Sequence, residues 1–141
     1  MNLEFMNEMK DKYLQTDEGK GVLLAGITLG MLAYQQKNGN DGQKVSDTPL
    51  FKQIHWGKMT YRDLKRLLAR VPELLKAYKV NYASYMSSLN GKSGELLLKE
   101  DTKDLGVNGN FAFTIGFVNS YDYFWKVFTK EVEQKEEGTH V

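Results

Sequence analysis

The sequence predicts an all-α protein, a single compact bundle of about six or seven helices. Three observations support this prediction. The chain has only two prolines in 141 residues. Strong helix formers are frequent, and apolar residues recur at intervals of three and four over most of the length. The sequence has no run of alternating apolar and polar residues between hairpin turns that would indicate a β-sheet. Only the segment 95–99 is ambiguous.

The first third of the chain is expected to supply the central helix of the core. We expect one helix over residues 3–15, within an N-terminal helical segment 1–16, and a second over residues 17–36. The second is apolar on nearly every side, which predicts a central position. Its glycines, Gly26 and Gly30, would let another helix approach closely. Residues 37–47 are rich in asparagine and glycine and should form a loop.

Two short helices are expected in the middle of the chain. The first should begin at Thr48 or Pro49, because proline suits the first helical position, and should end near residue 56. The second should cover residues 61–69, since Thr60 is a favourable N-cap and Asp63 stands where a capping-box partner belongs.

The remainder is expected to hold two longer helices. Pro72 should begin the first, which ends at the Asn-Gly pair 90–91. A short helix and a loop should follow over residues 92–107. The last helix should begin within residues 108–110 and extend as far as residue 137, with an acidic end, 131–141, that frays. Its aromatic stripe comprises Phe113, Phe117, Tyr121, Phe124 and Phe128.

Length and composition point to one domain spanning residues 1–141. A chain of this length buries about two-thirds of its unfolded surface, which is enough for one core. The absence of cysteine excludes disulfides and thiolate metal sites, and it fits a reducing cytoplasm. The longest apolar stretch, residues 22–34, is too short to span a bilayer, and residues 1–10 do not resemble a signal peptide. We therefore expect a cytoplasmic protein with no membrane partner.

The residues that usually carry catalysis are sparse. Only two histidines occur, His55 and His140, and neither belongs to a metal-binding or nucleophile motif. The acidic residues of the C-terminal half are interpreted as solvated surface rather than as metal ligands. We expect no enzyme activity, no metal and no cofactor. The acids considered were Glu95, Glu100, Asp101 and Asp104.

Basic residues are concentrated in one stretch, residues 52–79. This stretch holds eight lysines and arginines against two acids, a net charge of +6, whereas the whole chain carries +1. A local positive field of this kind favours contact with phosphate. The basic residues are Lys52, Lys58, Arg62, Lys65, Arg66, Arg70, Lys76 and Lys79.

Four of these cations should share one face of the helix over residues 61–69. Their i, i+3, i+4, i+8 spacing places them together, and apolar residues take the other side. Four like charges along about 12 Å of helix axis, with few acids between them, favour phosphate contact over a face that is merely solvated. We predict nucleic-acid contacts by Arg62, Lys65, Arg66 and Arg70, with Lys52, Lys58, Lys76 and Lys79 as weaker candidates.

Two other modes of nucleic-acid binding were considered. Trp56, Tyr61 and Tyr34 could stack on bases of a single strand, although such aromatics more often belong to a core or its rim. A helix-turn-helix is conceivable near Gly57, where short helices meet. A protein that binds the phosphate backbone is favoured over it, because recognition helices mix Asn, Gln and Ser with their basic residues, whereas the basic residues here lie along one helix face.

Over most of residues 17–120, this chain resembles the C-terminal helical region of the large subunit of type I-B CRISPR Cascade complexes. In that family the region is also made separately, from an internal start, as the small subunit, and a short chain beginning at Met1 fits the separate product. The similar segments are 17–36 (DEGKGVLLAGITLGMLAYQQ), 48–54 (TPLFKQI), 60–68 (TYRDLKRLL), 72–78 (PELLKAY) and 111–117 (FAFTIGF).

The resemblance implies a function that composition alone does not give. Such small subunits are non-catalytic helical bundles that stack in more than one copy. They brace the duplex of guide RNA and target DNA and hold the displaced DNA strand. The implied partners are the large subunit, the backbone subunits, the guide RNA, both DNA strands and further copies of the chain.

Two alternatives remain open from the sequence. One is a small subunit of a type III CRISPR complex, which an all-helical composition does not exclude. The other is a helical protein-interaction module whose basic face binds an acidic partner.

Overall fold

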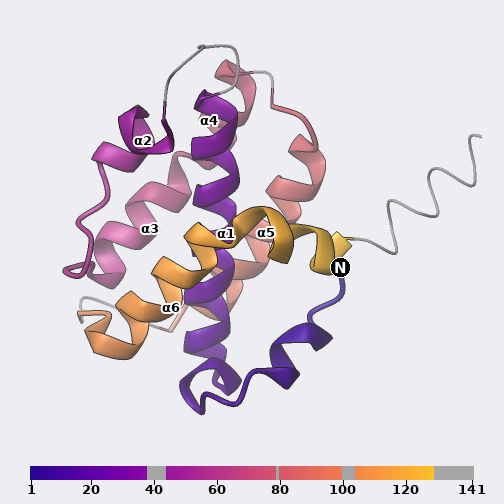
Figure 1. The fold of residues 1–141 in the computed structure, drawn as a ribbon, viewed down its shortest axis with the longest axis vertical. Helices are drawn as coiled ribbons and strands as arrows, with labels where there is room; N and C mark the ends of the chain where they lie inside the picture. The colour runs from indigo at the N-terminus through magenta and orange to yellow at the C-terminus, as the bar shows by residue number, and fades with distance from the viewer. Residues whose placement is uncertain (38–43, 79, 100–103, 129–141) are drawn as a thin grey trace, which may run out of the picture.

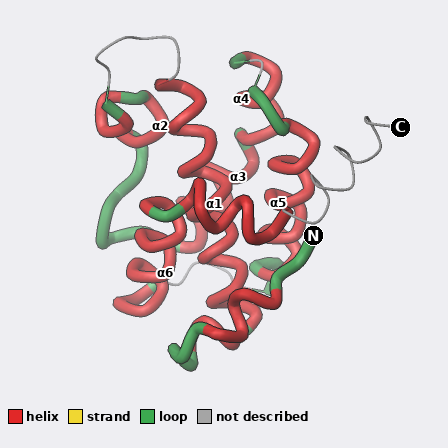
Figure 2. The backbone as a smooth tube through the Cα atoms, turned by 45° about the vertical axis from the view of Figure 1, so that its right-hand side comes forward, coloured by secondary structure: helices red, strands yellow, loops and turns green. Residues whose placement is uncertain are grey.

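The computed structural model describes residues 1–37, 44–78, 80–99 and 104–128, and these are mostly helical (Figures 1 and 2). Within them no β-strand occurs, only an isolated bridge between Thr60 and Asp104. The predicted all-α bundle is therefore confirmed. The α-helices are α1 (Asp17–Lys37), α2 (Pro49–Lys52), α3 (Tyr61–Ala69), α4 (Val71–Ala77), α5 (Ala83–Leu96) and α6 (Gly106–Val118), and residues 120–128 are also helical. The short 3-10 helices are Glu4–Glu8, Tyr13–Gln15 and Val45–Asp47.

Helix α1 forms the centre of the bundle, as its sequence predicted. Every residue from position 21 to position 33 is buried. Figure 1 shows α1 running through the middle of the molecule, with α6 crossing in front of it. The buried apolar side chains of all the helices form one continuous core around α1. A helix that is apolar on every side is stable in water only when other elements surround it.

Glycines bring the backbones of α1 and α6 into direct contact. A Cβ atom added at Gly30 would lie 2.6 Å from the carbonyl oxygen of Phe117, and one added at Gly116 would lie 2.5 Å from that of Leu23. At Gly26 it would collide with the carbonyl oxygen of Phe113. No side chain fits at these distances, so this crossing requires glycine. The predicted close approach of a second helix at Gly26 and Gly30 is confirmed.

The predicted helix over residues 3–15 is wrong. Two short 3-10 helices stand in its place, and the chain is extended at Met9 between them. The side-chain amide of Gln15 donates to the carbonyls of Met6 and Met9, over 2.9 and 2.7 Å. These carbonyls would bond to backbone N–H groups in an α-helix, so the side chain competes with helix formation here.

The predicted helix from Pro72 to residue 89 is divided in two. Helix α4 does begin at the predicted boundary, but it ends at Ala77, and Tyr82 adopts a left-handed conformation with φ of 61°. Helix α5 then passes through Asn90 and Gly91 without stopping. It continues because its next turn is tied to the core: the buried Ser93 hydroxyl donates to the Gly21 carbonyl of α1 over 2.8 Å.

The C-terminal helices carry most of the predicted aromatic stripe into the core. Four of the five predicted aromatics are buried, and Tyr121 is exposed. Helix α6 begins at Gly106, slightly before the predicted start, and a turn at Asn119 separates it from the helical residues 120–128. The expected extension to residue 137 and the acidic tail lie outside the described residues. The buried members are Phe113, Phe117, Phe124 and Phe128.

Helix α2 is shorter than expected, because the chain leaves the helix to place Trp56 against α6. The Trp56 ring lies 5.0 Å from the ring of Phe117 and 5.7 Å from that of Phe113, measured between centroids. Gly57, with φ of +77°, then turns the chain toward α3. Most of the predicted loop over residues 37–47 lies outside the described residues. In the described part of the chain, no helix has both the length and the apolar character needed to cross a bilayer.

The α1–α6 contact predicts opposite effects for alanine at different helical glycines. Gly30→Ala should lower the free energy of unfolding by about 1–3 kcal/mol, because the new methyl group overpacks a backbone contact. Gly94→Ala, on α5 with nothing within 4 Å of the added atom, should raise it by about 0.5–1 kcal/mol. Urea unfolding measures both values. Equal effects at the two positions would contradict the proposed crossing.

Candidate nucleic-acid interface

The N-terminus of helix α3 is fixed by the cap that the sequence predicted. The Thr60 hydroxyl accepts a hydrogen bond from the Asp63 amide over 3.1 Å. Asp63 stands at the third helical position, where a capping-box partner belongs, and its interaction with Thr60 lowers the pKa of the Asp63 carboxylate. The start of α3, and therefore the direction of every side chain along it, is set by this pair.

Helix α3 divides into a buried face and a basic face, as predicted. Tyr61 is only 1% exposed, and its hydroxyl bonds to the Glu18 carboxylate at the start of α1. On the outer side Arg62, Arg66 and Arg70 are exposed and Lys65 is half-buried. We call these four residues the basic face. The other buried residues of the inner face are Leu64, Leu67, Leu68 and Val71.

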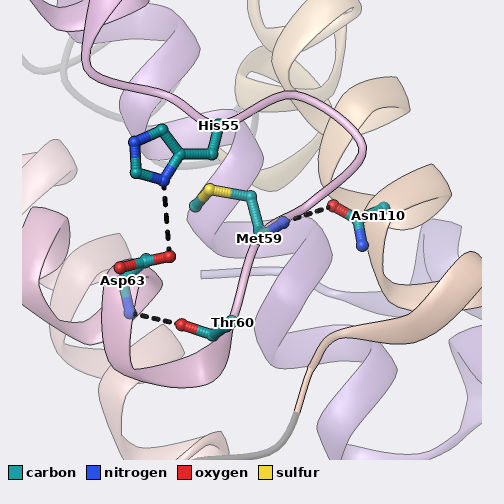
Figure 3. A network of polar contacts seen from close by, with 5 residues as sticks. All are labelled: His55, Met59, Thr60, Asp63 and Asn110. Carbon is teal, nitrogen blue, oxygen red and sulfur yellow. Dashed lines mark hydrogen bonds and ion pairs between the residues drawn. The ribbon is translucent and has the colours of Figure 1, made fainter.

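The loop before α3 is held against the start of α6. The Met59 amide donates to the side-chain oxygen of Asn110 over 3.0 Å, and the Met59 carbonyl accepts from the Leu105 amide over 3.0 Å. Figure 3 shows this connection beside the Thr60–Asp63 cap. Because the starts of α3 and α6 are joined through this loop, the position of α6 on α1 also determines where the basic face points.

The acid of α3 is paired with the histidine of the preceding loop. The Nδ1 atom of His55 lies 3.6 Å from the Asp63 carboxylate (Figure 3). Partial burial raises the pKa of Asp63, but the hydrogen bonds from Thr60 and His55 and the charge of His55 outweigh it, so this pKa lies below its ordinary value. The carboxylate therefore stays ionised at neutral pH.

A surface cavity of about 290 Å³ lies at the C-terminal half of the basic face. It is lined by Arg66, Leu67 and Arg70 of α3, by Asp63, and by Gln53 and His55 of the loop. The Arg70 guanidinium donates to the side-chain oxygen of Gln53, which fixes one wall. The cavity therefore brings two of the predicted cations together with two residues that the sequence did not single out.

The other predicted cations are spread more widely. Lys52 ends α2, Lys58 follows Gly57, and Lys76 lies on α4; all three are exposed. None of them lines the cavity. Lys79 lies outside the described residues. The structure thus places Arg62, Lys65, Arg66 and Arg70 on one helix face, while Lys52, Lys58 and Lys76 come from separate elements.

The predicted stacking aromatics do not form one platform. Tyr61 is buried on the inner face of α3, which excludes base stacking there and agrees with the more common core position of such aromatics. Trp56 is half-buried in the aromatic cluster with Phe51 and Phe117. Tyr34 is 39% exposed, with the Lys37 ammonium 5.9 Å from its ring centre. Stacking by Tyr34 stays a prediction.

A second surface on helix α6 and its continuation was not predicted. Its exposed fractions are 88% for Val107, 57% for Phe111, 64% for Val118 and 63% for Tyr121, and Thr114 lies between them half-buried. We call these five residues the α6 stripe. Their alternating spacing of four and three, inside the uncharged run 105–121, was the available signal. The aromatic core pattern of the same helix obscured it.

The α6 stripe borders an apolar cavity of about 310 Å³. Thr114 and Val118 line this cavity from α6, and Tyr34 of α1 lies on its other side. The remaining lining residues are Val45, Phe51, Trp56 and Phe117. The stripe and the cavity together form one extended apolar surface, of the kind that marks contacts with other proteins.

The acids considered as metal ligands do not converge where the structure describes them. Glu95 and Asp104 are exposed, and Glu100 and Asp101 lie outside the described residues. Among the described residues, no group of three or more His, Asp or Glu side chains could hold a metal ion.

The fold and this surface define an all-helical domain with a basic face on one short helix. The family model for the C-terminal domain of CRISPR-associated protein TM1802 matches residues 2–131. The chain belongs to this CRISPR-associated family, which confirms the predicted relationship to CRISPR Cascade proteins. No curated protein and no solved structure matches it.

The Asp63 network predicts a pH-dependent contribution to stability. Because the folded-state pKa of Asp63 lies below its ordinary value of 3.8, the stabilisation is present above that value and is lost as pH falls through the folded-state pKa. Wild type should therefore be more stable than Asp63→Asn near neutral pH, and the difference should shrink as pH falls below 3.8 and through the folded-state pKa. Denaturant unfolding across this pH range measures it. A difference that is constant with pH would contradict the network.

Proposed function

We propose that this chain acts as a non-catalytic small subunit of a type I-B CRISPR RNA-guided complex in the cytoplasm, bracing nucleic acid through its basic face. Family membership supports the CRISPR context. The observation that carries the specific function is the basic face itself: Arg62, Lys65 and Arg66 on α3 and Arg70 at its C-cap, with the three arginines exposed.

The chemistry of the basic face suits backbone contact. Lysine and arginine bind phosphates without reading sequence, and the affinity falls steeply as salt rises. In RNA-guided complexes base pairing reads the sequence, and protein contacts to the backbone tip a strand exchange that is nearly balanced in free energy. A few cations held on one rigid helix would supply such contacts to the guide–target duplex or to the displaced strand.

The α6 stripe supports a second part of the proposal, docking onto another protein subunit of the complex. An exposed row of mostly apolar side chains on an uncharged helix carries no cation that would attract phosphate. Its spacing of four and three suits packing against an apolar helix face. The domain would thus use two surfaces: the basic face toward nucleic acid and the α6 stripe toward a large or backbone subunit. We propose that further copies of the chain stack in the same complex.

Charge reversal on α3 should weaken nucleic-acid binding by the assembled complex. In Arg62→Glu/Arg66→Glu, the slope of log affinity against log salt should flatten by about 1.4, if each arginine contacts one phosphate of a single strand. Filter binding of target DNA over a salt series measures the slope.

The matched control for this variant is Lys10→Glu/Lys12→Glu, which makes the same charge change at two exposed lysines far from α3 in sequence. It should leave the slope close to wild type. An unchanged slope in the α3 variant would remove the basic face from the proposal. Equal flattening in both variants would indicate an effect of overall charge instead.

Acidic residues in the α6 stripe should prevent assembly without loss of folding. Phe111→Asp/Val118→Asp places charge on an exposed apolar row, and it should weaken association with the complex at least about 30-fold, as loss of interface anchors does. Co-purification with the other subunits and circular dichroism of the free chain measure assembly and folding.

Leu98→Asp is the control for the stripe, because Leu98 is also an exposed apolar residue but lies after α5, outside the stripe. It should assemble as wild type does. Wild-type assembly of the stripe variant would show that another surface docks the subunit.

A further inference from the structure

We propose that the cavity beside Arg66 and Arg70 binds one phosphate group of a nucleic-acid backbone through both arginines and His55. We call this binding site the seat. This inference rests on the proposed function and deepens it, because it replaces a diffuse positive surface by one defined contact. The sequence pointed only to a row of cations. It assigned no function to Gln53 or His55, which form the facing wall.

The two arginines are arranged to act on the same group. They stand one helical turn apart on α3, so their guanidinium groups border the same opening. Arg70 donates to the Gln53 side chain, which holds it in place. A guanidinium has five N–H donors, so a single protein acceptor leaves donors for an incoming oxygen. Arginine held in this way favours paired hydrogen bonds to phosphate.

Asp63 also lines the cavity, and its charge opposes an anion there. Thr60 and His55 lie beside this carboxylate and lower its pKa. Two arginines against one carboxylate leave the cavity with a net positive charge. Because the Nδ1 atom of His55 faces Asp63 (Figure 3), the Nε2 atom on the other edge of the ring is available as a donor when the ring is protonated.

The size of the cavity fits a phosphodiester group rather than a single small ion. One water molecule occupies about 30 Å³ in the liquid. A cavity of about 290 Å³ therefore has room for a phosphate, part of its sugar and some water. Leu67 lines the cavity and gives the sugar an apolar surface to contact.

A defined phosphate site and a diffuse positive field differ in how DNA affinity changes when arginine is replaced by lysine. Lysine keeps the charge of arginine but lacks the planar fork that binds two oxygens at once. We therefore propose Arg66→Lys/Arg70→Lys, which preserves net charge, and Lys10→Arg/Lys12→Arg as the control, because these exposed lysines lie outside the basic face and the exchange also preserves net charge. These positions are exposed, so folding should be unaffected.

The test uses the chain assembled with its partner subunits and a single-stranded DNA probe at fixed salt. The seat predicts that Arg66→Lys/Arg70→Lys weakens binding about tenfold or more, while Lys10→Arg/Lys12→Arg stays within about twofold of wild type. Wild-type affinity in the double variant would overturn the seat and leave the proposed function intact. No DNA binding by the wild-type assembly at any salt would overturn both.

A second measurement locates the contact on the DNA. In the complex with a paired target, single phosphates can be replaced by uncharged methylphosphonates, one position at a time. The seat predicts a sharp loss of affinity at one position per copy of the chain, and this loss should vanish in Arg66→Lys/Arg70→Lys. A small, even loss at every position, identical in the variant, would overturn the seat in favour of a diffuse field.

Discussion

The direct contact between the backbones of α1 and α6 is the constraint on which the rest of the structure depends. Gly26 and Gly30 on α1 face Gly116 and the carbonyls of α6, and none of these positions has space for a Cβ atom. The contact places the long, largely buried helix α1 beneath α6 and its aromatic side chains. Packing at this distance gains dispersion contacts along both helices, and it leaves few alternative crossing positions.

The candidate interface follows from that contact through a short chain of hydrogen bonds. The start of α6 holds Met59 through Asn110 and Leu105, and the next residue, Thr60, caps α3. Beneath α3, Tyr61 reaches Glu18 at the start of α1. Helix α3 is therefore tied to both central helices, and its outer face is free to carry cations. A rigid support of this kind reduces the side-chain and backbone ordering that binding a strand would otherwise require.

The sequence predicted the elements whose signals are local and agree with their packing. Helix α1 has an unbroken apolar run, and α3 has both a cap and a two-faced pattern. Predictions failed where tertiary contacts overrode local signals. Asn90 and Gly91 suggest a helix end, yet Ser93 ties the following turn to α1. The cations of the site were predictable from spacing, because three lie on one short helix and Arg70 is its C-cap. The cavity was not, because His55 and Gln53 reach it from a loop whose path depends on the packing of Trp56 against α6.

The central claim is that this domain contributes electrostatic contacts to nucleic acid within a CRISPR complex. The most direct measurement compares single-stranded DNA binding over a salt series for the chain alone, for the guide-loaded complex lacking it, and for the complete complex. The account predicts a steeper salt dependence and tighter binding for the complete complex than for either part. Identical salt slopes with and without the chain, despite normal assembly, would contradict the account and assign the basic face to a protein contact.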